Sequence, residues 1–127
     1  NYRTVLSIEA GTMIDMIRHE ILPAVSRYAA DLCQRAERKK GLGLPCAYEL
    51  NTAKGISEIT DNLMEQCRVL ASDLEDMPAG PEEAMRYCHD TLIPDMNDAR
   101  TAVDSLEVLT ASEYWPMPVY SELLFSV

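Results

Sequence analysis

Three clusters of helix-breaking residues divide this sequence into long uninterrupted stretches. The clusters are Lys40–Pro45, Met77–Pro81 and Trp115–Pro118, and they hold most of the five glycines and seven prolines of the chain. Glycine and proline are the strongest local signals for turns and helix ends. The sequence between the clusters therefore predicts helices over about residues 4–38, 47–76 and 82–111.

Apolar residues in each stretch recur at alternating steps of three and four. They are Ile14, Ile17, Ile21, Val25, Tyr28, Leu32 and Ala36; then Ile56, Ile59, Leu63, Cys67, Leu70, Leu74 and Met77; then Met85, Cys88, Leu92, Met96, Ala99, Val103 and Leu106. This period is typical of helices that pack lengthwise at shallow angles. With short linkers between them, the stretches predict an all-α fold. We expect an antiparallel up-down-up bundle of three long helices over residues 1–111, and a docked tail of the same domain over 112–127.

Two prolines lie inside predicted helices. The apolar pattern continues in phase on both sides of Pro23 and Pro94, so each is expected to kink its helix rather than end it. Gly11 and Thr12, followed by Asp15, resemble a capping box, which leaves open a break of the first helix near Gly11. We favour one continuous helix there.

Composition bounds the class of protein. The chain has 127 residues, of which 47% are hydrophobic and 25% charged, which suits one globular domain. A net charge of −10 argues against a nucleic-acid partner, since a polyanion needs a basic surface. No run of 18 apolar residues and no signal peptide is present, so no membrane partner and a cytoplasmic location are expected. The first residue is Asn1 rather than methionine, and we expect a piece of a larger protein.

The four cysteines show no metal-binding spacing and are expected to be free thiols. Cys67 and Cys88 fall on the apolar pattern and are expected in the core. Cys33 adjoins that pattern. Cys46 lies in the first linker and is expected to be the most exposed thiol.

Few residues suggest catalysis. His19 and His89 are the only histidines, and although Asp15 and His19 stand four apart, a solvated helix face explains them better than a metal site. We therefore expect no catalytic, cofactor or metal site in this chain. Three polar residues, Arg100, Asp104 and Glu107, share one helix face; the sequence leaves open an exposed pair or a covered polar network.

The tail is unusually apolar. Its candidate docking residues are Trp115, Pro116, Pro118, Tyr120, Leu123, Leu124 and Phe125. The two prolines favour an extended backbone, and the aromatic and leucine side chains offer large apolar surfaces. We expect this tail to dock on its own bundle or on a neighbouring subunit.

The same tail carries a resemblance to a known family. Its pattern Trp115-Pro116-x-Pro118-x-Tyr120-x-x-Leu123-Leu124-Phe125 is similar to the carboxyl terminus of type III glutamine synthetases. Three weaker motifs agree in order: Ile8-Glu9-Ala10-x-Thr12-Met13, Ile21-Leu22-Pro23-Ala24 and Met96-x-x-x-Arg100-x-x-x-Asp104-x-Leu106-Glu107.

This resemblance implies an ATP-dependent glutamate–ammonia ligase that uses Mg or Mn and works as a large homo-oligomer in the cytoplasm. The catalytic residues of such an enzyme would lie upstream, outside this chain. The chain would be its C-terminal structural domain, with the catalytic domain and neighbouring subunits as partners. The alternative is a stand-alone helical-bundle binding protein, whose ligand would lie in the bundle core or groove.

Overall fold

The computed structural model describes residues 2–117 and builds them into three long helical runs. The elements are α1 (Tyr2–Met16), η1 (Ile17–Ile21) and α2 (Leu22–Gly41); α3 (Ala47–Glu75); and α4 (Pro81–Tyr87), η2 (Cys88–Leu92) and α5 (Ile93–Leu109). The prediction of an all-α fold with three long helices is confirmed, and within the described range there is no strand. None of the helices in that range is long and apolar enough to cross a membrane.

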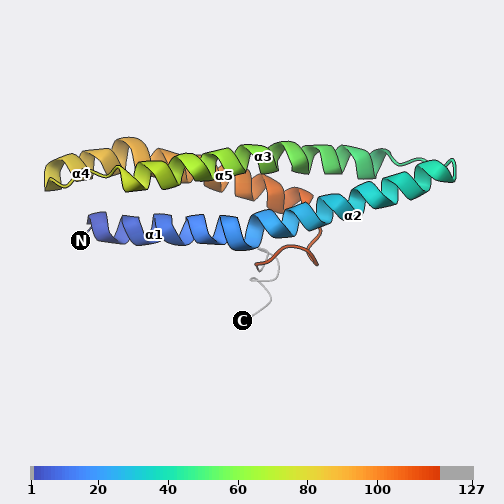
Figure 1. The fold of residues 1–127 in the computed structure, drawn as a ribbon, viewed down its shortest axis with the longest axis horizontal. Helices are drawn as coiled ribbons and strands as arrows, with labels where there is room; N and C mark the ends of the chain where they lie inside the picture. The colour runs from blue at the N-terminus through green and yellow to red at the C-terminus, as the bar shows by residue number, and fades with distance from the viewer. Residues whose placement is uncertain (1, 118–127) are drawn as a thin grey trace.

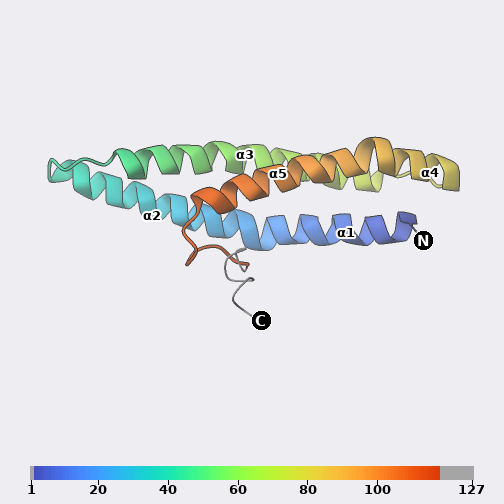
Figure 2. The same cartoon turned by 180° about the vertical axis from the view of Figure 1, so that it is seen from behind.

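Helix α3 is the centre of the arrangement. It packs along α2, α5 and α1, while α1 also touches α4. Figure 1 shows the chain turning back after α2 and again after α3, so that all three runs lie side by side. The hairpin of α2 and α3 reaches beyond the end of α5, as the reverse view in Figure 2 also shows. Gly55 permits close packing where α5 ends, because a Cβ there would lie 3.4 Å from Cδ1 of Leu109.

The two turns use the residues that first marked them in the sequence. Gly43 has φ of 73°, a left-handed conformation that favours glycine, and Leu44 N–H donates to the Lys39 carbonyl at 2.8 Å. At the other turn Gly80 is extended and Pro81 opens α4, with Glu82 and Glu83 in its first turn. Proline at the first position and acids near the helix N-terminus both favour a helix start there.

Both internal prolines follow a single π-helical turn. The N–H of Leu22 bonds to the Ile17 carbonyl, and the N–H of Ile93 bonds to the Cys88 carbonyl, each one residue further back than in an α-helix. Pro23 and Pro94 come directly after these residues. A wider turn moves the preceding carbonyls away from the proline ring, with which they would clash in a regular helix. Neither proline ends its helical run, and Figure 1 shows the first run changing direction where α1 meets α2.

The first helix has no break near Gly11. Helix α1 runs from Tyr2 to Met16, so the prediction of continuity at this position is confirmed. The run departs from α-helical geometry at the π turn η1 instead, where the sequence contains no glycine.

The predicted apolar stripes form the core, with one error. All seven predicted positions of the first helix are buried, and Leu6 and Ala10 extend the stripe. In the third run Met85 is 61% exposed and Ala84 is buried instead. The reason is the π turn: Ala84, Cys88, Leu92 and Met96 follow one another at steps of four. In a regular α-helix such steps rotate the stripe by about 40° each, whereas a turn that holds an extra residue keeps it in line.

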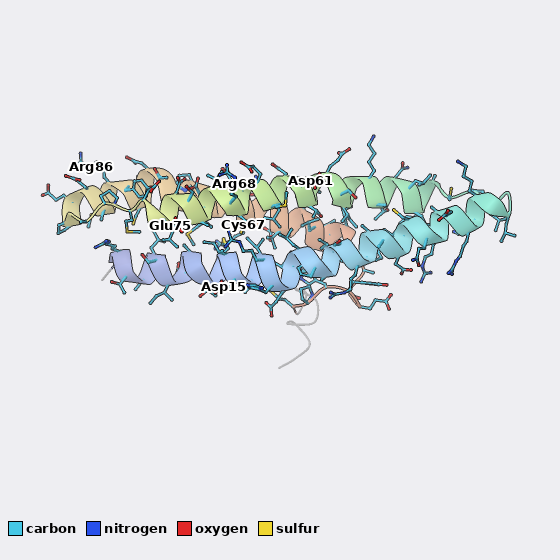
Figure 3. All side chains as sticks on the ribbon, viewed as in Figure 1. Asp15, Asp61, Cys67, Arg68, Glu75 and Arg86 are labelled. Carbon is cyan, nitrogen blue, oxygen red and sulfur yellow. The ribbon has the colours of Figure 1, made fainter. Side chains whose placement is uncertain are left out.

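The thiols are all free, as predicted. Cys67 and Cys88 are buried in the core, and Figure 3 places Cys67 on the side of α3 that faces α1. Burial raises the pKa of the Cys67 thiol, although Arg18 lies beside it. The expectation for Cys46 was wrong, because Cys33 is the exposed thiol and Cys46 is half-buried. Cys33 follows the buried Leu32 by one residue, which turns it away from the core.

Replacement of a core thiol tests this packing. Cys67→Ser or Cys88→Ser would bury a hydroxyl without a partner and should lower the free energy of unfolding by about 1–3 kcal/mol. The matched control Cys33→Ser should change it little, because that side chain is exposed. Urea denaturation measures the difference. Equal stability of all three variants would contradict the core assignment.

Candidate functional site

The chain turns back after α5. Thr110 is extended, and the N–H groups of Tyr114 and Trp115 bond to the Ala111 carbonyl at 2.9 and 3.2 Å. In Figures 1 and 2 the segment then runs along α2 towards the junction with α1. The tail thus begins by folding back on the bundle.

Tyr114 fixes the start of this segment on α2. Its ring packs against Tyr28, with centroids 4.9 Å apart, and its hydroxyl donates to Asp31 Oδ2 at 2.8 Å. Arg35 Nε donates to the other oxygen of Asp31 at 3.2 Å. The hydrogen bond from Tyr114, then that from Arg35, holds the pKa of Asp31 below its ordinary value. The pKa of Tyr28 is raised to about 12. The main cause is burial, and the second is the hydroxyl of Tyr48, whose oxygen lies 3.4 Å from that of Tyr28.

Trp115 is buried and belongs to the hydrophobic core, with Met117 partly buried against it. Pro116 is exposed. The remaining candidate docking residues, Pro118, Tyr120, Leu123, Leu124 and Phe125, lie outside the described residues. Docking of the tail as a whole therefore stays a prediction.

An apolar groove lies between α1 and α5. Its volume is about 560 Å³, and its lining includes Ile17, Ile21 and Met96, which belong to the core. Glu9 and Thr12 from α1, and Arg100 and Asp104 from α5, supply its polar atoms. Glu9 and Thr12 belong to one of the sequence motifs described above, and Arg100 and Asp104 belong to another. The two motifs are far apart in the sequence, so the sequence did not predict that they meet. The geometry joins them because both helices pack on α3.

The polar residues of α5 lie at the solvent boundary of this groove. Arg100 and Asp104 are exposed, Glu107 is half-buried, and within residues 2–117 no ion pair joins Arg100 to Asp104. Among residues 2–117 they form neither the exposed ion pair nor a covered network, and the part of the tail that would cover them lies outside the described residues.

The histidines form no evident catalytic or metal-binding cluster in the described part of the chain. His19 is exposed beside Asp15, in a shallow depression that Thr12 and Glu20 also line. Figure 3 shows Asp15 on the side of α1 away from α3. His89 is exposed, and its Nδ1 atom lies 3.0 Å from Oδ1 of Asp90. Among the residues described, no three His, Cys, Asp or Glu side chains are grouped as metal ligands.

A carboxyl pair that the sequence did not reveal joins α3 to α5. Desolvation, then the neighbouring carboxyl of Asp73, raises the pKa of Asp95 to about 7, with Asp98 adding to the effect. One oxygen of Asp95, Oδ2, is buried without a hydrogen-bond partner. Tyr87 lies close by and donates to the Asp73 carbonyl at 2.7 Å. In the sequence, Pro94 directly before Asp95 is the feature that could have drawn attention to this position.

Comparison with known proteins identifies the family. The family model "Glutamine synthetase C-terminal domain" matches residues 1–40. A glutamine synthetase of Butyrivibrio fibrisolvens is 30% identical over 131 residues, which is 100% of this chain and 19% of that protein. A type-3 glutamine synthetase of Dictyostelium discoideum is 22% identical over 98% of the chain and 18% of its own length. A glutamine synthetase of Bacteroides fragilis is 28% identical, with 98% of the chain and 18% of that protein covered. No solved structure matches significantly.

The chain belongs to the glutamine synthetase C-terminal domain family. It spans about a fifth of the length of the curated relatives that it matches. The resemblance seen in the sequence is therefore confirmed. Within this glutamine synthetase domain, the family match covers α1, η1 and most of α2, including the π turn before Pro23.

The carboxyl pair predicts how the stability of the domain depends on pH. Because the pKa of Asp95 is raised to about 7 from an ordinary value of 3.8, the folded chain binds a proton that the unfolded chain releases. The resulting stabilisation is complete below about pH 4 and is lost as the pH rises towards about 7. Between about pH 5 and about pH 8, Tm should fall in the unchanged chain and fall less in Asp95→Asn, which keeps a neutral side chain.

Calorimetry or circular dichroism at a series of pH values measures this difference. Asp104→Asn is the matched control, because Asp104 is exposed on the same helix and is not among the groups that raise the pKa of Asp95, so the slope should stay nearly unchanged. The same slope in Asp95→Asn as in the unchanged chain would refute a protonated Asp95.

Proposed function

We propose that this chain is the C-terminal structural and assembly domain of a glutamine synthetase, a glutamate–ammonia ligase that consumes ATP. The observation that carries the proposal is the match of the whole chain to about a fifth of several glutamine synthetases. In this role the domain contacts the catalytic domain of the same polypeptide and neighbouring subunits of a cytoplasmic homo-oligomer. Its acidic charge of −10 fits no role in nucleic-acid binding.

Catalysis belongs to other parts of the proposed enzyme. Phosphoryl transfer needs metal ions and cationic groups around the phosphate. The described residues offer no group of three potential metal ligands, and the exposed His19 and His89 stand on separate helices. We therefore place the ATP site and the Mg or Mn sites outside this chain and assign it no catalytic or cofactor-binding residue.

The proposed structural role rests on an up-down-up bundle that carries an aromatic tail. Burial of Trp115 and the hydrogen bond from Tyr114 to Asp31 support an ordered start of that tail. Two prolines lower the entropy that the tail loses on docking. A tail anchored in this way is suited to hold a helical extension against the rest of a subunit.

The alternative, a stand-alone binding protein, would use the groove between α1 and α5. The match along the full chain favours the enzyme fragment instead. A reading frame that continues upstream of Asn1 into a catalytic domain would separate the two functions.

The isolated chain should have no ligase activity, since its described residues show no grouped metal ligands of the kind that phosphoryl transfer needs. The measurement is release of phosphate from ATP in the presence of glutamate, ammonia and Mg or Mn. The longer enzyme serves as the positive control. Release of phosphate that depends on glutamate in the purified 127-residue chain would contradict this proposal.

Removal of residues 114–127 should leave the bundle folded but less stable and should impair assembly of the longer enzyme.

Trp115→Ala alone should lower the free energy of unfolding by about 3–5 kcal/mol, because it empties a buried site of large volume. Val108→Ala is the control, since Val108 is 84% exposed. Thermal melting and size-exclusion chromatography measure the two effects. An unchanged Tm and oligomer after truncation would exclude a structural role for the tail.

A further inference from the structure

The groove between α1 and α5 exposes an apolar surface that the described residues leave uncovered. Ile8 at its margin is 63% exposed, and Met13, Met16 and Val103 are only partly buried. We propose that residues 119–125 of this same chain lie in this groove and close the bundle between α1 and α5. The inference deepens the proposed structural role of the tail by naming the site where it binds.

The path of the chain leads towards the groove. Tyr114 is anchored beside Tyr28 and Asp31, and the segment then runs along α2 towards α1. From Tyr28 to Ile21, where the groove begins, the helix rises only about 10 Å. The described part of the segment bends at Pro116 and ends at Met117, which is partly buried against the core. The ten residues that follow span up to about 33 Å when extended, so they can cover this rise without any rearrangement of the helices.

The length of the groove matches the length of the segment. From Ile21 to Ile8 the helix rises about 20 Å, and seven extended residues span about 23 Å. The volume of about 560 Å³ is that of a site for several bulky groups. Residues 119–125 therefore can cover most of its length.

The chemistry of the two surfaces is complementary. The groove has an apolar floor, which includes Ile17, Ile21 and Met96. The segment supplies Val119, Tyr120, Leu123, Leu124 and Phe125, whose burial is favourable. Among the charged groups, Arg100 at the groove forms no ion pair with another described residue, and Glu122 of the segment carries the opposite charge. Pairing of these two would place Leu123 and Leu124 beside the apolar floor.

Hydrogen exchange of the segment tests the proposal in the full 127-residue chain. Ile8→Asp puts a charge into the groove, whereas Val5→Asp puts the same charge on the same helix outside it; Val5 is 53% exposed and does not line the groove. Both residues are exposed, so neither change should unfold the bundle. Mass spectrometry should find amides of residues 119–125 exchanging about tenfold faster in Ile8→Asp than in the unchanged chain and in Val5→Asp.

Three results would overturn the proposal. The first is unprotected exchange of residues 119–125 in the unchanged chain, which would leave the groove to another segment or partner. The second is equal protection in Ile8→Asp and Val5→Asp. The third is protection that rises with protein concentration together with a dimer in sedimentation, which would make a second copy the donor. None of these results depends on ligase activity or enzyme assembly, so failure here is distinguishable from failure of the proposed function.

Discussion

The accommodation of a proline inside two long helices is the constraint on which the rest of this structure depends. At Pro23 and at Pro94 a π turn directly precedes the proline and lets the helical run continue. Each turn also keeps its buried residues in line: Ile17 and Ile21 flank the first, Cys88 and Leu92 the second. Without these turns, either the helix would end or its apolar stripe would rotate off α3. The register error at Met85 and Ala84 has the same origin, since the extra residue of η2 shifts the inward position of α4.

Helix α3 depends on this register because it contacts both other runs along its length. Its contacts with α2 are reinforced at the hairpin end, where Lys39 bonds to the buried Glu49 at 2.6 Å. That hydrogen bond lowers the pKa of Glu49 and keeps its charge compensated. At the other end Tyr87 and the Asp73–Asp95 pair join α3 to α4 and α5. The two ends of the bundle are thus held by polar contacts of different kinds, with an apolar core between them.

The region that suits a structural role lies where this packing is incomplete. Helices α1 and α5 each pack on α3 but leave a groove between them, and the aromatic segment after α5 turns back beside α2. Membership of the glutamine synthetase C-terminal domain family gives these features a context. In the structural role that we propose, the groove and the segment anchored by Tyr114 would supply the contacts with the rest of the enzyme. Among the residues described, no three His, Cys, Asp or Glu side chains are grouped as metal ligands.

The sequence by itself determined the three helices, their turns and most of the core. It could do so because glycine and proline act locally and apolar spacing reports a helical face, as the buried stripe from Ile14 to Ala36 shows. The residue pattern of the aromatic tail also pointed to the family. Only the tertiary structure decided the features that depend on residues far apart in the chain: the contact of Tyr114 with Asp31, the raised pKa of Asp95 and the groove between α1 and α5. It also decided the π turns, because a turn that adds one residue is stabilised by the packing of the stripe on α3, and a heptad pattern cannot reveal it.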